Sequence, residues 1–139
     1  MLLEDDGCHL FFEGLINGVK ANMLVDTGAS MTVFDKNRIL NFINKAEYKK
    51  KVKYKMSTGL GTRTMQSQKV LLRKIEFNEL LLENYEAIMV DMKHVNVAYE
   101  QMDLPLVDGV MGGDLLKKYN VVIDYEKEIL ILSNNLSNS

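Results

Sequence analysis

Two apolar runs near the start of the chain are separated by a turn dipeptide. Residues 8–16 and 19–25 are rich in apolar and aromatic residues, and Asn17-Gly18 lies between them. Asn-Gly in this position indicates a tight β-turn, because both turn residues need a positive φ angle. The pattern therefore predicts a β-hairpin whose second strand ends at Val25-Asp26.

The pattern becomes helical after Asp35. Residues 31–34 form a short β-prone piece, and Asp35 is a good helix N-cap. Apolar residues then recur at helical spacing, which predicts one helix at about 36–46. These apolar residues are Ile39, Leu40, Ile43 and Ala46.

A lysine-rich stretch follows with a period of two. Every second residue from Lys49 to Lys55 is a lysine, and Val52, Tyr54 and Met56 lie at alternate positions. This alternation predicts a strand from residue 49 to 56 with one wet face. Such lysines most often mark a solvated strand that is protected against edge pairing. The alternative that they attract acidic substrates or membrane phosphates stays open.

The rest of the chain predicts more strands than helices. The predicted strands are 63–77, 80–91, 107–111, 121–125 and 129–132. Turns are predicted at 58–62 and 78–79, a loop with a helical turn at 93–104, and a short helix at 115–119 that Asp114 caps. Because helices do not alternate with strands, we expect an all-β or β-rich small barrel with one or two short helices.

Composition and charge narrow the class of protein. The chain has 139 residues, 47% of them hydrophobic and 26% charged, which predicts one globular domain with a core at 8–132 and a polar tail at 133–139. The net charge of −2 disfavours a general nucleic-acid binder, and the single cysteine excludes an internal disulfide. No apolar run reaches the ~20 residues that span a bilayer.

The start of the chain lacks the basic residues and the long apolar stretch of a secretory signal. We therefore expect a cytoplasmic protein without membrane or nucleic-acid partners, although a chain whose signal had been removed would look the same.

One segment carries candidate chemistry, namely Leu24-Val25-Asp26-Thr27-Gly28-Ala29-Ser30. An apolar strand delivers a carboxylate into a turn of small residues. Gly28 lets another backbone approach closely and allows unusual backbone angles, and Thr27 offers a hydroxyl to neighbouring backbone. A strand followed by an Asx turn would give the same pattern, so the segment alone leaves its role open.

This segment resembles the active-site motif of retropepsin-like aspartic proteases. A second motif of that family, two apolar residues and a glycine before a short helix, is matched by Val110-Met111-Gly112-Gly113-Asp114-Leu115-Leu116. The order of hairpin, Asp-Thr-Gly turn, glycine-containing flap, second motif and final strands also agrees. The resemblance covers about residues 8–132 and is closest to bacterial single-domain relatives, whose C-terminal stretch looks like Gly112 to Leu132.

The resemblance implies an aspartic endopeptidase without metal or cofactor. One motif per chain implies a homodimer in which Asp26 of each subunit meets at the two-fold axis. Two carboxylates about 3 Å apart share one proton, so one activates water while the other polarises the peptide carbonyl. Thr27 would link the two turns, and Gly28 would contact the peptide substrate, which binds by β-augmentation. Substrate contacts are further implied for Ala29, Ser30, Thr58, Gly59, Leu60, Gly61, Val110 and Met111.

Two departures and two alternatives accompany this resemblance. Ser30 and Gly113 stand where retroviral enzymes commonly pair an acid with an arginine, which suggests a weaker or differently built dimer.

Two alternative functions stay open. The first is a retropepsin-like module that dimerises or binds peptides without catalysis, and the second is a monomeric barrel that binds a small ligand. Asp108 and Asp124 are candidate second acids within one chain. Cys8-His9 and His94 match no zinc spacing.

Overall fold

The computed structural model describes residues 4–5, 10–43, 48–58 and 61–132. The strands are β1 (Glu4–Asp5), β2 (Leu10–Ile16), β3 (Val19–Val25), β4 (Val33–Asp35), β5 (Tyr48–Thr58), β6 (Gly61–Phe77), β7 (Leu80–Val90), β8 (Gly109–Met111), β9 (Val122–Asp124) and β10 (Ile129–Ile131). The helices are the 3-10 helix η1 (Ile39–Asn41) and the α-helices α1 (Lys93–Gln101) and α2 (Gly113–Lys118).

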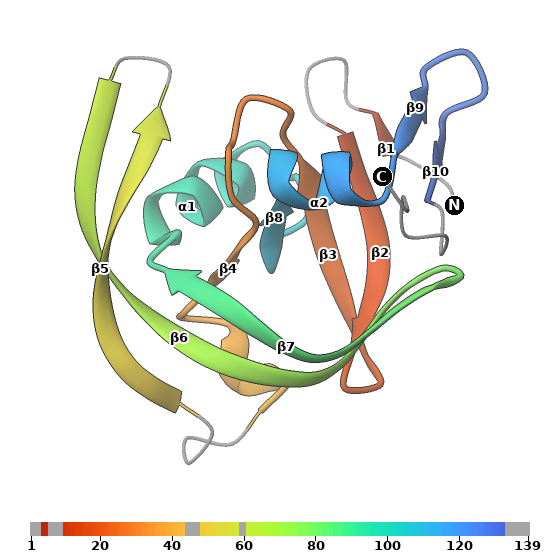
Figure 1. The fold of residues 1–139 in the computed structure, drawn as a ribbon. Helices are drawn as coiled ribbons and strands as arrows, with labels where there is room; N and C mark the ends of the chain where they lie inside the picture. Colours follow the sequence, from red (N-terminus) through yellow and green to blue (C-terminus); the bar gives the residue numbers. More distant parts are fainter. Residues whose placement is uncertain (1–3, 6–9, 44–47, 59–60, 133–139) are drawn as a thin grey trace.

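Six of these strands close into a barrel. The order β2-β3-β8-β4-β7-β6 returns to its start, because β6 also pairs with β2 through Leu15↔Glu76 and Ile16↔Ile75. β1 and β5 extend the sheet at its two ends, and β9 pairs with β10 in a separate two-stranded sheet. Figure 1 shows α1 and α2 above the long, curved β6–β7 hairpin. This closed, β-rich architecture with short helices confirms the predicted fold class.

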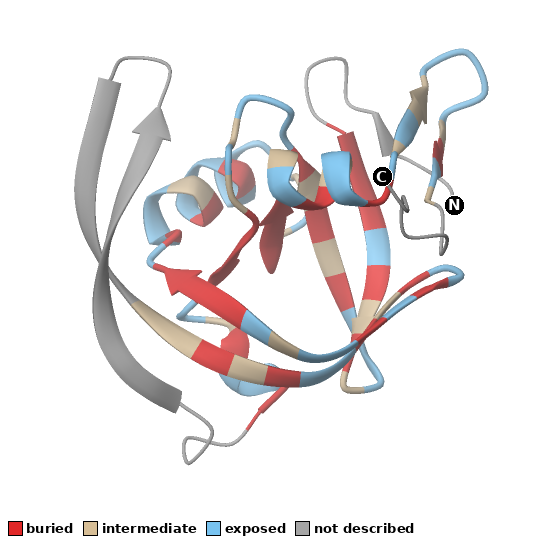
Figure 2. Cartoon of the chain, in the orientation of Figure 1, coloured by how far each residue is buried: buried red, intermediate tan, exposed pale blue. Residues whose placement is uncertain are grey.

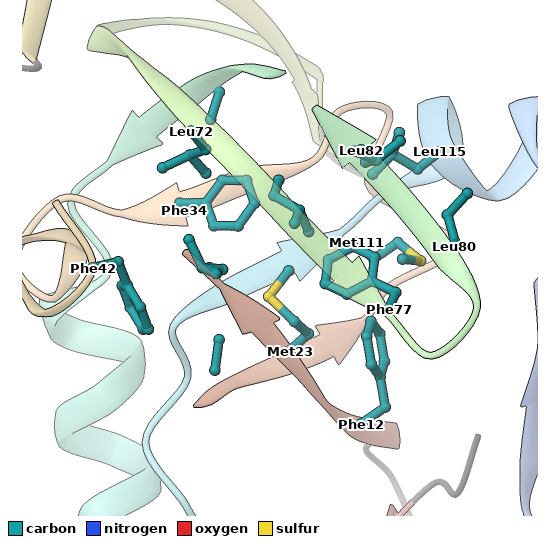
Figure 3. Packing of buried hydrophobic residues seen from close by; sticks show 14 of the residues in the cluster. Phe12, Met23, Phe34, Phe42, Leu72, Phe77, Leu80, Leu82, Met111 and Leu115 are labelled. Carbon is teal, nitrogen blue, oxygen red and sulfur yellow. The ribbon is translucent and has the colours of Figure 1, made fainter. Parts of the chain in front are cut away.

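At the point where β2 and β6 close the barrel, Gly14 leaves room for the ring of Phe77. A Cβ atom on Gly14 would lie 2.5 Å from Cδ1 of Phe77, so a larger residue in β2 would push β6 away. The Phe77 ring instead packs edge-on against Phe12, with ring centroids 5.1 Å apart. Figure 3 shows these two rings at one end of the core.

The core follows the alternation of the strands. From Phe12 to Ile16 of β2 and from Ala21 to Val25 of β3, every second residue is buried, because successive side chains of a strand point to opposite faces (Figure 2). The larger cluster fills the barrel, and its central residues include Met23, Phe34, Leu72, Met89 and Met111. A second cluster gathers around Phe11, Tyr99 and Val107, where α1 covers the outside of the sheet.

The first hairpin is confirmed down to its turn. β2 and β3 pair from Leu10↔Val25 to Ile16↔Val19. Asn17 and Gly18 have φ angles of 50° and 81°, which are the two positive values that a two-residue hairpin turn requires. Because this turn fixes the register, it also fixes where β3 ends and therefore where Asp26 lies.

The predicted helix at 36–46 is wrong over the described residues 36–43, which contain only the short η1. Ile39, Phe42 and Ile43 are buried, so the apolar spacing was real. Leu40 is 45% exposed and does not belong to that face. The carboxylate of Asp35 accepts hydrogen bonds from the backbone of Asn37 and Met92 and from the Asn96 amide, so it joins three segments instead of starting a helix.

Helix α1 is longer than the single helical turn predicted within 93–104, and its buried positions are partly polar. The buried residues of α1 are Asn96 and Tyr99, and Val97 is exposed, which blurs the apolar pattern. The side-chain amide of Asn96 donates a hydrogen bond to the Val107 carbonyl and accepts one from the Val107 N–H, which connects α1 to the segment just before β8.

Asp91 accepts a hydrogen bond from the backbone of Lys93 and one from Asn37, and these bonds lower the pKa of Asp91.

The remaining predicted elements are confirmed with shifted ends. β5 and β6 form a long hairpin, and β5 lies at the sheet edge, which agrees with the edge-protection interpretation of its lysines. α2 begins at Gly113, two residues before its predicted start, and Asp114 lies in its first turn instead of preceding it. The last hairpin forms as predicted from β9 and β10. No helix in the described part of the chain is long and apolar enough to cross a membrane.

Candidate active site

Strand β8 joins the two sequence motifs. It lies between β3 and β4, parallel to the first and antiparallel to the second. The register pairs Val25 with Met111, so both strands end at the same level. The backbone N–H of Asp26 then donates a hydrogen bond to the carbonyl of Met111 over 3.1 Å. The Asp-Thr-Gly turn and Gly112 therefore leave the sheet side by side.

The turn holds the Asp26 carboxylate by backbone groups. The N–H of Gly28 donates to Oδ1 of Asp26 over 2.9 Å, and the N–H of Ala29 donates to the Asp26 carbonyl over 3.2 Å. Asp26 itself is exposed, although the strand that carries it ends in the buried Val25. Within the described part of the chain, Oδ2 of Asp26 accepts no hydrogen bond. That oxygen is available to a water molecule or to a second carboxyl group.

Gly28 is needed for space and not for an unusual backbone angle. A Cβ atom at this position would lie 3.2 Å from Oδ1 of Asp26. Its φ angle is outside the left-handed region, which Gly18 alone among the described glycines occupies. Gly28 therefore does not use the freedom of a positive φ angle, and its near neighbour in this structure is the Asp26 side chain.

Two backbone hydrogen bonds connect the turn to α2. The N–H of Gly113 donates to the carbonyl of Ala29 over 2.6 Å, and the N–H of Asp114 donates to the carbonyl of Ser30 over 3.2 Å. A Cβ atom on Gly112 would lie 2.6 Å from the carbonyl oxygen of Met31. The second motif therefore needs glycine at 112, because the two backbones touch there.

The exposed Asp114 and the buried Thr32 form a connection that the sequence analysis did not identify. Oδ1 of Asp114 accepts hydrogen bonds from the Thr32 N–H, the Thr32 hydroxyl and the Leu115 N–H, over 2.9, 2.6 and 2.8 Å. The Thr32 hydroxyl oxygen in turn accepts from the N–H of Gly112 over 3.0 Å. Thr32 is 1% exposed. The position of Asp114 directly after Gly112-Gly113 was the only local signal that it belongs to the site.

Tyr85 on β7 extends this connection into the barrel. Burial, followed by the nearby charge of Asp114 and by Tyr119, raises the pKa of Tyr85 from 10.0 to about 12. Tyr85 packs against the main core cluster. The carboxylate of Asp114 therefore acts both on the turn after Asp26, through Thr32, and on Tyr85 of β7.

A pocket of about 450 Å³ opens beside the turn. It is lined by Thr27, Gly28, Ala29 and Ser30 from the turn and by Gly113, Asp114 and Lys117 from α2. Four of the predicted site residues thus share one concave surface next to Asp26. The pocket wall carries the side chains of two hydroxyl residues, one acid and one lysine besides the small residues of the turn.

The other predicted site residues are placed less directly. The side chains of Val110 and Met111 are buried; Met111 reaches the turn through its carbonyl, and Val110 pairs with Leu24 of β3. Thr58 and Gly61 are the last pair of the β5–β6 hairpin, and Gly59 and Leu60 lie outside the described residues.

Neither candidate second acid lies beside Asp26. Asp108 is buried, binds Nε of Arg38 over 2.7 Å and accepts from the N–H of Asn22. Asn22 precedes Asp26 by four residues, which is about 13 Å along a strand. Asp124 belongs to the separate β9–β10 sheet and accepts from the N–H of Lys127.

No metal cluster accompanies these acids. Among the residues that the structure describes, no group of three histidine, cysteine or acidic side chains is placed to hold a metal ion. Cys8 and His9 lie outside those residues.

Solved structures share this fold. A retropepsin-like aspartic protease from Rickettsia conorii superposes with a TM-score of 0.58 at 18% identity, covering 94% of this chain and 85% of the other. The retroviral protease-like domain of Ddi1 from Leishmania major superposes with a TM-score of 0.55 at 14% identity, covering 92% and 90%. These likenesses establish the retropepsin-like fold.

Sequence comparison establishes the family. No curated protein matches the chain at a significant level. The sequence profile of the family described as aspartyl protease matches residues 12–115, a span that runs from β2 through both motifs into α2. This span is well over half of the 139 residues. The chain therefore belongs to the aspartyl protease family and has its retropepsin-like fold.

Proposed function

We propose that this protein is a homodimeric aspartic endopeptidase. The catalytic group is a pair of Asp26 carboxyls, one from each subunit, and the substrate is a peptide that lies extended in a groove between the subunits. The observation that carries this proposal is the geometry of Asp26, which is exposed at the end of a buried strand and held through Oδ1 by the N–H of Gly28. Its other oxygen has no partner among the described residues.

The reaction follows from bringing two such carboxyls together. Two carboxyl groups about 3 Å apart cannot both ionise, so they share one proton. The ionised member takes a proton from a water molecule, and the water oxygen attacks the peptide carbonyl carbon. The protonated member donates to the carbonyl oxygen, and a proton then passes to the leaving nitrogen as the C–N bond breaks. The Gly28 N–H keeps each carboxylate in its orientation throughout.

The remaining residues bind the substrate in this proposal. Thr27 links the two turns across the dimer. The walls of the pocket, Gly28 to Ser30, offer backbone groups to an extended peptide, as in β-augmentation. The hairpin tip between β5 and β6 closes over the peptide as a flap. Val110 and Met111 support the turn from below through their backbone.

The test compares the parent protein with Asp26→Asn. Both are incubated with a peptide library at several pH values, and products are read by mass spectrometry. Asn preserves the size of the side chain but cannot ionise, so we expect cleavage to fall by about a thousandfold or more. Asp124→Asn serves as the matched control, because Asp124 lies in the separate β9–β10 sheet, and it is expected to cleave like the parent.

Other outcomes would contradict the proposal in different ways. Cleavage that persists in Asp26→Asn would assign the activity to another group or to a contaminant. A folded, dimeric parent that binds peptides but cleaves none would favour the alternative of a non-catalytic peptide-binding module.

A further inference from the structure

Lys117 brings an ammonium group into the pocket beside the Asp26 turn. It lines the pocket together with the turn residues, and its side chain is exposed. Within the described part of the chain, Lys117 makes no ion pair and no side-chain hydrogen bond. The adjacent Lys118 differs, because its Nζ lies 5.6 Å from the centroid of the Tyr119 ring and the residue does not line the pocket.

The acidic residue of the same pocket is already engaged. Oδ1 of Asp114 accepts three hydrogen bonds, from two groups of Thr32 and from Leu115, so this carboxylate serves to hold the turn. The other five residues of the wall, Thr27 to Ser30 and Gly113, carry no charge. Of the two charged side chains on the wall, Lys117 is the one for which no hydrogen bond or ion pair is seen within the described residues, so its ammonium group can donate to a ligand.

We infer that the site selects peptides that carry an acidic side chain where they meet Lys117. The inference rests on the proposed function for the identity of the ligand, a peptide bound beside Asp26. The carboxylate of an aspartate or glutamate accepts a charge-assisted hydrogen bond from the ammonium group. In a two-fold dimer Lys117 occurs twice, so acidic residues are preferred at two positions, at equal distances on either side of the scissile bond.

Peptide binding to the Asp26→Asn protein tests this without requiring turnover. The immobilised protein captures peptides from an octapeptide library in which one position at a time is fixed as Asp, Asn or Lys, and mass spectrometry reads the bound fraction. We expect Asp to be enriched over Asn by about threefold to tenfold at two symmetric positions. Adding Lys117→Gln abolishes this enrichment, and Lys117→Glu reverses it in favour of Lys. Lys118→Gln is the matched control and leaves it unchanged.

The result that overturns the inference is enrichment that does not depend on residue 117. Equal capture of Asp and Asn peptides, or an Asp preference that survives Lys117→Gln and disappears only with salt, would show that Lys117 selects nothing. Failure of the proposed function looks different, because it is read from cleavage by the parent protein. A parent that cleaves no peptide, while Asp26→Asn still prefers acidic peptides through Lys117, contradicts the protease and supports the inference.

Discussion

Asp114 fixes the relative position of two segments that lie 82 residues apart in the sequence. In Asp114→Ala the N–H and hydroxyl of Thr32 lose their acceptor while remaining buried. An unsatisfied buried polar group costs about 1–3 kcal/mol, so we expect the free energy of unfolding to fall by about that amount. Peptide cleavage is expected to fall as well, because the Ser30–Thr32 backbone is released. Urea denaturation and a cleavage assay measure the two effects.

Two further variants separate the hydrogen bonds from the charge at this position. Asp114→Asn keeps an oxygen that accepts hydrogen bonds, and we expect a smaller loss than in Asp114→Ala. Glu126→Gln, in the exposed β9–β10 turn, controls for the removal of an acidic residue. An Asp114→Ala protein as stable as its parent would refute the role of this side chain.

Tyr85 gives a pH-dependent signature at the other end of the same connection. Its pKa is raised from 10.0 to about 12, so folding favours the neutral phenol. The stability that this provides is complete below pH 10 and is lost as the pH rises to about 12. We expect Tyr85→Phe to unfold less steeply with pH in this range than the parent does. Thermal melts between pH 9 and 12 compare the two, and parallel curves would show that Tyr85 is not the group responsible.

At the scale of single residues, the sequence predicts a site residue whose partners are its neighbours in the chain. It does not predict one whose hydrogen-bond partner is far away in the chain. Asp26 was predictable because its strand, its turn and its glycine are consecutive in the chain. Thr32 and Asp114 meet only because β8 inserts beside β4, which no local pattern reveals. Lys117 was equally hidden, since an exposed helical lysine is ordinary in sequence.

At the scale of the elements, the end of β8 lies against the turn that follows Asp26. The adjacent residues Gly112 and Gly113 allow a paired test of this contact. In Gly112→Ala the new Cβ would lie 2.6 Å from the Met31 carbonyl oxygen and 2.9 Å from that of Ala29. Both are backbone atoms, so the turn must move. In Gly113→Ala the closest atom is the Ala29 carbonyl oxygen at 3.4 Å, an ordinary contact.

We therefore expect opposite results from the pair. Gly112→Ala loses roughly 1–3 kcal/mol of stability, in the range of overpacked core substitutions, and most of its cleavage activity. Gly113→Ala keeps its activity and gains up to about 1 kcal/mol, because alanine is the better helix former within α2. Melting curves and cleavage rates of both variants decide this. Equal tolerance of both substitutions would mean that the contact between the two backbones is not needed.

The elements also show where sequence patterns succeed. The long strands were predictable, since their alternation and their Asn-containing turns agree, and both Asn17 and Asn78 adopt positive φ angles. The interpretation fell short at α1 and failed at 36–43, where the buried polar side chains of Asp35 and Asn96 connect segments far apart in the sequence. In those places tertiary hydrogen bonds replace the local signals of capping and periodicity.

For the whole molecule, the proposed chemistry depends on a second copy of the chain. Asp108 and Asp124, the two candidate second acids of one chain, bind other groups. We expect a threefold excess of Asp26→Asn protein to reduce the activity of the parent to about a quarter when subunits mix at random. The mixture is incubated before the assay so that the subunits can exchange. Unchanged activity would indicate a monomeric enzyme or subunits that do not exchange.

The insertion of β8 between β3 and β4 has a consequence for how the protein is made. Residues 109–113 leave the ribosome long after the first two strands of this trio, yet they supply the Met111 carbonyl that receives the Asp26 N–H and the Gly113 N–H that binds Ala29. A nascent chain that ends before α2 has its catalytic aspartate but no assembled turn. The Asp26 turn is therefore assembled only when translation of the domain is nearly complete, so the proposed peptidase activity would first appear at that stage.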